Sequence, residues 1–380
     1  MQPIYLDYAA TTPVDSQVAQ AMSECLERDG KFANPASRSH LYGWQAEEAV
    51  EAARGQVAAL LGADAREVVW TSGATESNNL ALKGLCQPGD HLLVSAIEHK
   101  AVLDPAEWLA GQGAEVSYVE PDTTGQVSAE AVEASIRRNT RLVSVMFANN
   151  ELGTLNPIAE IAQVCRKHQC LLHVDAAQAV GKIPVDVKAL GVDLLSVSAH
   201  KLYGPKGIGA LYVRRSPEIN VMAQIHGGGH ERGMRSGTLP THQCVGMGLA
   251  CELAEQNMER DRANIGALRD TLWQGIKNLP GVRLNGHPSD RLYSHLNVAF
   301  DGVDGEMLLL SLRRLAVSSG SACTSATMSP SYVLKAIGLS DAEALSSLRI
   351  SLGRYTDEQQ VQQAIAHIID VVGKLHTKAS

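Results

Sequence analysis

The sequence predicts an α/β protein, with a large domain built on a mostly parallel, seven-stranded sheet and a smaller α+β C-terminal domain. Between about Glu67 and Arg214, short apolar runs alternate with amphipathic stretches, as in βαβ units whose sheet is covered on both faces. After a long helical pattern from about Met247 to Asn278, strands and helices become fewer and more mixed. The 380 residues also exceed the usual domain size of about 100–200.

Apolar runs bounded by turn residues are the candidate strands. In the large domain they are Val68–Thr71, His91–Ser95, Glu115–Val119, Leu142–Phe147, Leu171–Val174, Leu194–Ser198 and Ile208–Val213. In the C-terminal region they are Leu296–Phe300, Leu315–Ser318 and Leu348–Leu352. Helices are expected at Pro157–Lys167, Asp304–Arg313, Pro330–Ile337 and Asp357–Lys374, and in a pattern from Val50 to Leu60 that Gly62 ends. We expect a large domain of residues 16–257 and a smaller domain of residues 1–15 and 258–380.

Composition bounds the class of protein. Apolar residues make up 45% and charged residues 19%, as in an ordinary globular chain, and the net charge of −8 gives no general attraction to nucleic acids or anionic membranes. The seven cysteines lack paired C-x-x-C spacing, which argues against a disulfide framework or a zinc ribbon and suits a reducing cytosol. No secretory signal and no apolar run long enough to cross a bilayer is visible. We therefore expect a cytoplasmic protein that binds neither membranes nor, stably, nucleic acids.

Lys201 is the most informative single residue. It closes the segment Ser198-Ala199-His200-Lys201, directly after a strand-like apolar run, and Gly204 follows shortly. A lysine desolvated at a strand end can have its pKa lowered enough to form a Schiff base. For the lysine alone, a surface position in a glycine-rich turn is the alternative.

Other strand ends carry polar residues, and ligands of open α/β sheets bind at the carboxyl ends of strands. The turn Ser72–Glu76 opens a helix, where backbone N–H groups near Ala74 and the Thr75 hydroxyl suit a phosphate, although such a threonine is usually a cap. Asp175 ends another strand, with Gln178 three residues on. A protonated heterocycle nitrogen would satisfy this aspartate, as would a structural arginine or a helix N-terminus.

Together these residues supply what pyridoxal 5′-phosphate needs. Lys201 can form the Schiff base, and Asp175 can keep the ring nitrogen protonated. The candidate phosphate ligands are Ala74, Thr75, Ser198 and His200. His99, after another strand, can stack on the ring or move protons, although helix capping is its plainer role. Asn150 follows a strand in the same way, with turn formation as the alternative.

Cys323 lies in a run of small polar residues, Ser318 to Ser325, between a strand and the helix that Ser329-Pro330 begins. Most free cysteines behave as small buried apolar residues, and we assign this role to the other six: Cys25, Cys86, Cys165, Cys170, Cys244 and Cys251. A thiol in a solvated loop can be deprotonated and can move, as nucleophilic sulfur chemistry requires.

Arg349 alternates with the apolar residues of its strand and can grip the carboxylate of an amino-acid substrate with its planar fork. A solvated strand arginine is equally compatible with this segment. Asn34, in an Asn-Pro pair that also suits an ordinary turn, can assist it. His226 and His230 lack a third or fourth ligand at suitable spacing, so no intrinsic metal is expected, and their glycine-rich stretch suits an anion-binding loop or a subunit contact.

Several segments resemble the pyridoxal-phosphate-dependent cysteine desulfurases of the IscS/NifS type, within the class V aminotransferase group. The most specific are Thr71–Glu76, Ser198–Lys201, Arg235–Thr238 and Ser319–Ser325. The resemblance runs from Tyr5 to Arg354, nearly the whole chain. The chain departs from the family at Ala199, where glycine is frequent, and this small change should be tolerated. The sequence also stops soon after its last helix, whereas many members carry a longer tail that docks the iron–sulfur scaffold, so delivery to that scaffold is a weaker expectation than the desulfurase chemistry.

The resemblance implies the type I aminotransferase fold and a homodimer in which Thr238 reaches the neighbouring subunit's cofactor phosphate. It also implies that Gln178 contacts the ring hydroxyl, that Asn150 lies beside the cofactor and that Arg349 holds the substrate carboxylate. The implied reaction converts L-cysteine to L-alanine and leaves a persulfide on Cys323.

In that reaction Lys201 moves the Cα proton, and His99 is the candidate for handling the substrate thiol proton. The persulfide would serve acceptors, such as an iron–sulfur scaffold, in iron–sulfur cluster assembly, or tRNA thiolation. A selenocysteine lyase or aminotransferase of the same fold is the alternative among enzymes. A non-catalytic sulfur-carrier or assembly subunit is the alternative outside them, although every expected catalytic position is filled.

Overall fold

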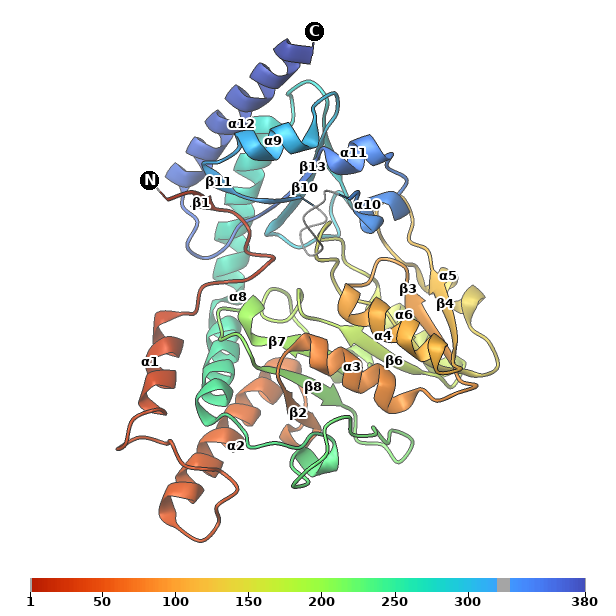
Figure 1. Ribbon diagram of the computed structural model, residues 1–380, viewed down its shortest axis with the longest axis vertical. Coiled ribbons are helices and arrows are strands. Elements are labelled where there is room, and N and C mark those ends of the chain that lie inside the picture. Colours follow the sequence, from red (N-terminus) through yellow and green to blue (C-terminus); the bar gives the residue numbers. More distant parts are fainter. Residues whose placement is uncertain (1, 320–328, 380) are drawn as a thin grey trace.

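The computed structural model of the protein describes residues 2–319 and 329–379. Figure 1 shows the large domain in the lower half and the small domain above it, with helix α8 (Thr241–Ile276) running through both. At about 1.5 Å per residue, the 36 residues of α8 span roughly 54 Å. The first half of α8 buries Cys244, Met247 and Cys251 in the large domain's core, and its second half buries Leu272 and Ile276 in that of the small domain. One helix therefore ties the two cores together.

The large domain contains the predicted seven-stranded sheet, in the order β2-β8-β7-β6-β5-β3-β4. Its strands are β2 (Val68–Thr71), β3 (His91–Ser95), β4 (Glu115–Val119), β5 (Thr140–Ser144), β6 (Leu171–Asp175), β7 (Leu194–Ser198) and β8 (Gly209–Val213). Strand β8 runs antiparallel to both of its neighbours, and every other pairing is parallel. The prediction of a mostly parallel sheet is thus confirmed.

The predicted strand Leu142–Phe147 is wrong at both ends, since β5 begins two residues earlier and its regular pairing ends at Ser144. The chain still follows β6 beyond that point, because the N–H groups of Val145 and Phe147 donate to the carbonyls of His173 and Asp175. Between them, the N–H group of Met146 donates to the buried Glu98 carboxyl instead of to a strand. A buried side chain therefore interrupts the ladder that the apolar run predicted.

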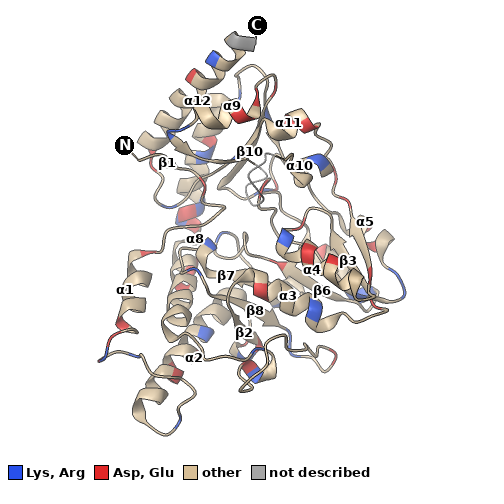
Figure 2. Ribbon diagram, viewed as in Figure 1, with Lys and Arg blue, Asp and Glu red and all other residues tan. Residues whose placement is uncertain are grey.

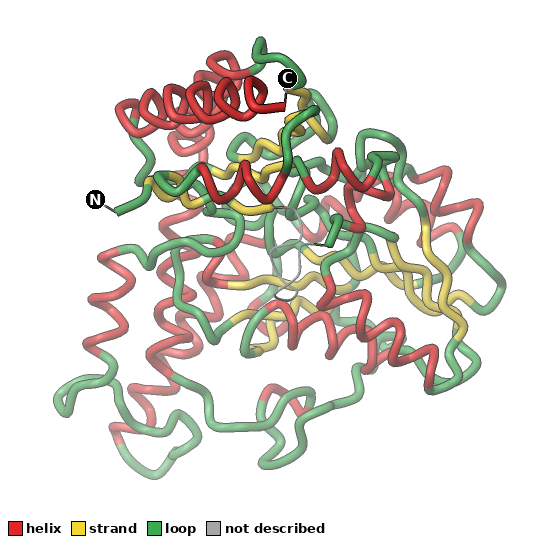
Figure 3. Tube along the Cα trace, turned by 45° about the horizontal axis from the view of Figure 1, so that its top comes forward, coloured by secondary structure: helices red, strands yellow, loops and turns green. Residues whose placement is uncertain are grey.

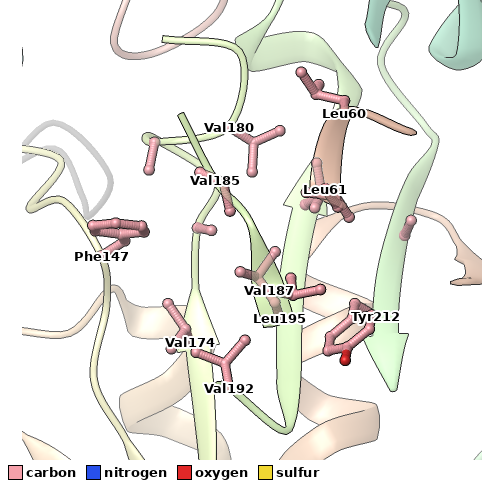
Figure 4. Close-up of a cluster of buried hydrophobic side chains, with 14 of the residues drawn as sticks. Leu60, Leu61, Phe147, Val174, Val180, Val185, Val187, Val192, Leu195 and Tyr212 are labelled. Carbon is pink, nitrogen blue, oxygen red and sulfur yellow. The ribbon is translucent and has the colours of Figure 1, made fainter. Parts of the chain in front are cut away.

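Helices cover both faces of this sheet (Figure 3). Helices α3 (Ala74–Leu85) and α4 (Lys100–Gly111) pack on one face, over Leu92, Val94 and Leu194. The other face packs on α2 (Leu41–Leu61), α6 (Ile158–Lys167), α7 (Val187–Leu190) and the first half of α8. Figure 4 shows part of this second core, where Val174, Leu195 and Tyr212 from neighbouring strands meet Leu60 and Leu61. The remaining helices of the large domain are α1 (Ser16–Glu24) and α5 (Ala129–Ser135), with 3-10 turns at Ala65–Glu67, Ala199–Lys201 and Glu231–Gly233.

The small domain is built on an antiparallel sheet in the order β12-β13-β10-β9. Its strands are β9 (Val282–Asn285), β10 (His295–Phe300), β12 (Ser318–Ser319) and β13 (Ser347–Ser351). Helices α9 (Gly305–Ser311) and α12 (Glu358–Ala379) and the end of α8 cover it. The N-terminal strand β1 (Ile4–Tyr5) pairs in parallel with β11 (Leu315–Ala316), so the first residues of the chain lie against the C-terminal region.

Two short helices, α10 (Tyr332–Ala336) and α11 (Asp341–Leu345), lie at the edge of the small domain beside the large one. Val333 and Leu334 of α10 pack with Ile97 and Leu152 of the large domain.

In the described part of the chain, no helix has the length and apolar character needed to cross a membrane. In Figure 2, lysines and arginines are interspersed with acidic residues on both domains.

Candidate active site

A cavity of about 560 Å³ lies at the carboxyl ends of the parallel strands, where the large domain faces the small one. The segments after β2, β3, β5, β6 and β7, the N-terminal segment and β13 all contribute to its walls. It brings together ten of the predicted site residues: Ala74, Thr75, His99, Asn150, Asp175, Gln178, Ser198, His200, Lys201 and Arg349. Residues from seven separate stretches of sequence thus form one site.

Lys201 ends the 3-10 turn that directly follows β7, and its side chain lines the cavity. Its Nζ donates to the carbonyl oxygens of Ala9 at 2.6 Å and Ala10 at 2.7 Å. The N-terminal segment therefore lies over the end of β7 and holds the lysine inside. The alternative of a surface lysine is excluded.

Asp175 is the last residue of β6 and is 5% exposed. Its Oδ2 accepts a hydrogen bond from Asn78 Nδ2 at 2.7 Å, and its Oδ1 accepts one from the Ala177 N–H group at 2.9 Å. These donors come from an amide side chain and the backbone rather than from an arginine. Sequence reasoning missed Asn78, whose signal was a polar residue one helical turn after Ala74.

The N-terminus of α3 forms one wall of the cavity. Its N-cap residue is Gly73, at φ 152°, so no side chain caps the first N–H groups of the helix. The turn approaches β8 so closely that a Cβ on Gly209 would lie 2.6 Å from Gly73 Cα. Thr75 is therefore not the N-cap, and uncapped N–H groups beside the cavity suit an anion.

Burial favours the neutral form of both histidines of the site. His99 caps α4, with Nδ1 accepting from the Ala101 N–H group at 3.0 Å, and it also lines the cavity, so both predicted roles are compatible with its position. When neutral, His99 then carries its proton on Nε2. Burial lowers the pKa of His99. Burial and then the Lys201 charge lower the pKa of His200 to about 4, so His200 is neutral near pH 7.

Arg349 reaches the cavity from β13 and is 7% exposed, so the alternative of a solvated strand arginine is wrong. One of its terminal nitrogens donates to Asp7 Oδ1 at 2.8 Å, and the other donates to the Asn150 carbonyl at 3.1 Å. Its Nε is buried and has no partner among the described residues. Asp7 was missed because it lies 342 positions away in sequence.

Of the three remaining predicted residues, the structure describes two, Asn34 and Thr238. Asn34 accepts a hydrogen bond from the Ala36 N–H group at 2.9 Å, as in an ordinary Asn-Pro turn, and it is not among the described residues that line the cavity. Thr238 is exposed and likewise absent from that lining. Cys323 lies outside the described residues. The structure therefore does not bring Asn34 or Thr238 to the cavity within one chain.

The other six cysteines are free and buried, as predicted. Two ion pairs hold the segment that follows His226 and His230. Glu231 pairs with the buried Arg54 at 2.6 Å, and Arg235 pairs with Glu76 at 2.8 Å. No group of three or more histidine, cysteine, aspartate or glutamate residues that could hold a metal ion is found within residues 2–319 and 329–379.

The family model for class-V aminotransferases matches residues 4–364. The chain belongs to this family. It is 59% identical over 377 residues to a protein named cysteine desulfurase IscS from Aeromonas salmonicida (strain A449), a match that covers 98% of this chain and 93% of that protein. This identity over nearly the whole length places the chain among the cysteine desulfurases.

Solved structures agree with this assignment. A NifS-like protein superimposes with a TM-score of 0.90 at 36% identity, covering 98% of this chain and 100% of that one. The structure described as SspA in complex with cysteine has a TM-score of 0.81 at 42% identity, covering 93% of this chain and 100% of that one. The predicted fold of a class V pyridoxal-phosphate enzyme is therefore confirmed.

Pyridoxal 5′-phosphate is the cofactor of this cysteine desulfurase, as in its family. The cavity fits it in three respects. Lys201 and the Asp175 carboxylate lie in the same cavity, and the N-terminus of α3 presents N–H groups that no side chain caps. Asn150 Oδ1 is buried beside it without a hydrogen-bond partner in the described part of the chain, which leaves an acceptor for a ligand.

Proposed function

We propose that this cysteine desulfurase converts L-cysteine to L-alanine, with Cys323 receiving the sulfur as a persulfide. The observation that carries the proposal is the cavity that holds Lys201, Asp175, His99 and Arg349 together. A lysine, a buried carboxylate, a neutral histidine and a buried arginine are the groups that amino-acid chemistry on this cofactor needs.

Bound pyridoxal phosphate supplies an aldehyde that joins to amines and a ring that withdraws electrons from the substrate's Cα–H bond. Lys201 would hold the cofactor and, once displaced by substrate, carry the Cα proton on Nζ. Asp175 would keep the ring nitrogen protonated, and its bonds from Asn78 and Ala177 support that role by stabilising the carboxylate. The proposed phosphate and ring ligands are Ala74, Thr75, Ser198, His200, Asn150 and Gln178.

Arg349 would hold the substrate carboxylate. Its buried Nε and its ion pair with Asp7 support this role, because the pair fixes the guanidinium while one donor stays without a partner among the described residues. Asn34 remains a proposed assistant of Arg349.

His99 would handle the substrate thiol proton, and its depressed pKa keeps the ring neutral near pH 7 beforehand. To take this proton at Nδ1, the ring would release the Ala101 N–H group from which Nδ1 now accepts. The Cys323 thiolate would then attack the substrate sulfur. An S–S bond forms as the Cβ–S bond breaks, and the electron pair left at Cβ takes up a proton to give alanine.

A homodimer is also part of the proposal. Exposed apolar side chains gather in and beside the connection between α1 and α2, at Leu26, Phe32, Leu41, Tyr42 and Trp44. Exposed clusters of this kind mark interaction sites on soluble proteins. A second copy covering this surface would bury it, and Thr238, exposed and outside its own chain's cavity, would then reach the partner's cofactor phosphate.

The domain boundaries, at residues 16–257 against 1–15 and 258–380, remain a proposal. The separation of the hydrophobic cores supports it, because Leu6 packs with residues 265–372 rather than with the core of the large sheet. The sulfur would pass, in the cytoplasm, to acceptor proteins such as an iron–sulfur scaffold, and also to tRNA thiolation. Buried free cysteines support a reducing compartment.

The test is incubation with L-cysteine while alanine and protein-bound sulfur are measured together. Cys323→Ala should keep the cofactor absorbance but lose both products, whereas Cys25→Ala, which changes a buried structural thiol, should keep both. Full activity in Cys323→Ala would refute the persulfide step.

A further inference from the structure

Lys182 lies behind the active-site cavity, in the turn region after β6. It lines a small interior cavity to which Lys201, Tyr203 and His295 also contribute. Lysine side chains are rarely placed in the interior without a specific partner. The reaction proposed above gives Lys182 no role, so its position calls for an explanation.

The contacts of Lys182 point toward the site. Its Nζ donates to the main-chain oxygen of Gln178 at 3.0 Å and to the side-chain Oε1 of Gln178 at 3.1 Å. The other end of the same amide, Nε2, donates to the Ala9 carbonyl at 2.8 Å. A glutamine amide can turn over and exchange its donor and acceptor ends. Lys182 therefore selects the orientation in which the Gln178 amide donates to Ala9.

Lys201 uses the same acceptor, since its Nζ donates to the Ala9 carbonyl at 2.6 Å. Lys182 and Lys201 are thus joined through Gln178 and one shared carbonyl. They also repel each other as cations. Burial, together with the charge of Lys201, lowers the pKa of Lys182 to about 7. In such a pair, a proton on one amine disfavours a proton on the other.

We infer that Lys182 is a positioning residue for the reaction, which holds the Gln178 amide in one orientation and disfavours the protonated form of the Lys201 nitrogen. The inference rests on the proposed function in one respect, namely that Lys201 is the lysine that bears the cofactor. A cation close to a reactive lysine keeps more of it in the neutral, nucleophilic form.

Other ionisable groups also face Lys201. Those that share the active-site cavity with it are Asp7, His99, Asp175, His200, Lys206 and Arg349. Those in the interior cavity, besides Lys182, are Tyr8, Tyr203, Asp261, Tyr293 and His295. All of them stay in place when Lys182 alone is changed, so a difference between variants reports the charge at position 182.

The experiment compares Lys182→Met and Lys182→Gln, which remove the charge, with Lys182→Arg, which keeps it. In the holoenzyme, absorbance of the bound cofactor is titrated with pH, and in the cofactor-free full chain, acylation of Lys201 is followed against pH by peptide mass spectrometry. In both neutral variants, the midpoint pH of each titration should rise by about one unit. At a pH below the midpoint, acylation of Lys201 should therefore fall about tenfold. Lys182→Arg should leave the midpoint at or below that of the wild type.

Lys188→Met, which removes an exposed lysine on α7, is the matched control and should not move the midpoint. Unchanged midpoints in the neutral variants, or the same upward shift in Lys182→Arg, would overturn the inference. If Lys182→Met does not fold, Lys182→Gln decides, because it keeps a donor for Gln178. A pyridoxyl group found on a lysine other than Lys201 would instead refute the proposed function, and the acylation midpoints would still be measurable.

Discussion

The Arg349 guanidinium and the Asp7 carboxylate form an ion pair of 2.8 Å that joins β13 to the N-terminal segment at the edge of the cavity. Both side chains line the cavity, and both are largely shielded from solvent. The pair holds Arg349 in place before a substrate carboxylate arrives.

Arg349→Lys should therefore impair substrate binding more than cofactor binding. A lysine keeps the charge but cannot bond Asp7 and a substrate carboxylate through a planar fork. We expect the KM for L-cysteine to rise about tenfold, because one charge-assisted hydrogen bond is lost. The cofactor absorbance should not change. Arg283→Lys, at an exposed ion pair on β9, is the control and should leave KM unchanged. A wild-type KM in Arg349→Lys would remove Arg349 from the substrate site.

Asn78→Leu should weaken cofactor binding. The substitution keeps the size of the side chain but leaves Asp175 Oδ2 without its donor at 2.7 Å. A hydrogen bond to a charged group contributes about 1.5–3 kcal/mol, so the Kd for pyridoxal phosphate should rise at least about tenfold in a titration of the cofactor-free chain. Asn257→Leu, whose amide bonds only within α8, should bind the cofactor normally. Equal affinities for the two variants would contradict the role given to Asn78.

Gly209→Ala should disturb the cofactor site through the backbone. The new Cβ would lie 2.5 Å from the Val197 carbonyl and 2.6 Å from Gly73 Cα, so the turn before α3 must shift. We expect a loss of about 1–3 kcal/mol in the free energy of unfolding, together with weaker cofactor binding. Gly55→Ala, in α2 with nothing within 4 Å of its Cβ, should instead be neutral or slightly stabilising in the same denaturation experiment. The account fails here if both substitutions behave alike.

His173 should make the protein less stable in acid. It is fully buried in β6 between the hydroxyls of Ser144 and Ser196, and burial lowers its pKa from the ordinary value of 6.5 to about 4. The unfolded chain therefore takes up a proton near pH 6.5, while the folded chain takes it up only near pH 4. The stability linked to this group is complete above pH 6.5 and is lost as pH falls from 6.5 to 4, by roughly 3 kcal/mol.

Urea denaturation across this pH range measures the effect. His173→Gln, which cannot take up the proton, should show a flatter pH dependence between 6.5 and 4 than the wild type. Parallel curves for the two proteins would show that His173 is not the group responsible.

Much of the site could be predicted because it is encoded locally. Lys201, Asp175 and Thr75 each lie within a few residues after an apolar run, and parallel strands bring their carboxyl ends to one edge, so pattern alone places them together. Asn78 and Asp7 were not found in this way, because their partners lie 97 and 342 positions away. The only local signal of Asn78 is its place one helical turn after Ala74, and Asp7 has none.

The fold, like the site, could be predicted where the signal is local and was missed where the signal is weak or depends on distant contacts. The strands of the large sheet were predicted nearly to their ends, whereas β9 was missed because four residues after Pro280-Gly281 carry too weak an alternation. The end of strand β5 was predicted too late because the end of its ladder depends on Glu98, a side chain from another turn. No signal for Lys182 is visible in the sequence either, since its inferred role depends on its contact with Gln178 and on the bond of Gln178 to Ala9.

The central claim is that this cavity is the cofactor site and that Lys201 bears the cofactor. Reduction of the holoenzyme with borohydride, followed by peptide mapping, tests it most directly. We predict a single pyridoxyl adduct on the peptide that contains Lys201, and its absence in Lys201→Ala. An adduct on Lys182, Lys206 or any other lysine of the wild-type protein would contradict the account.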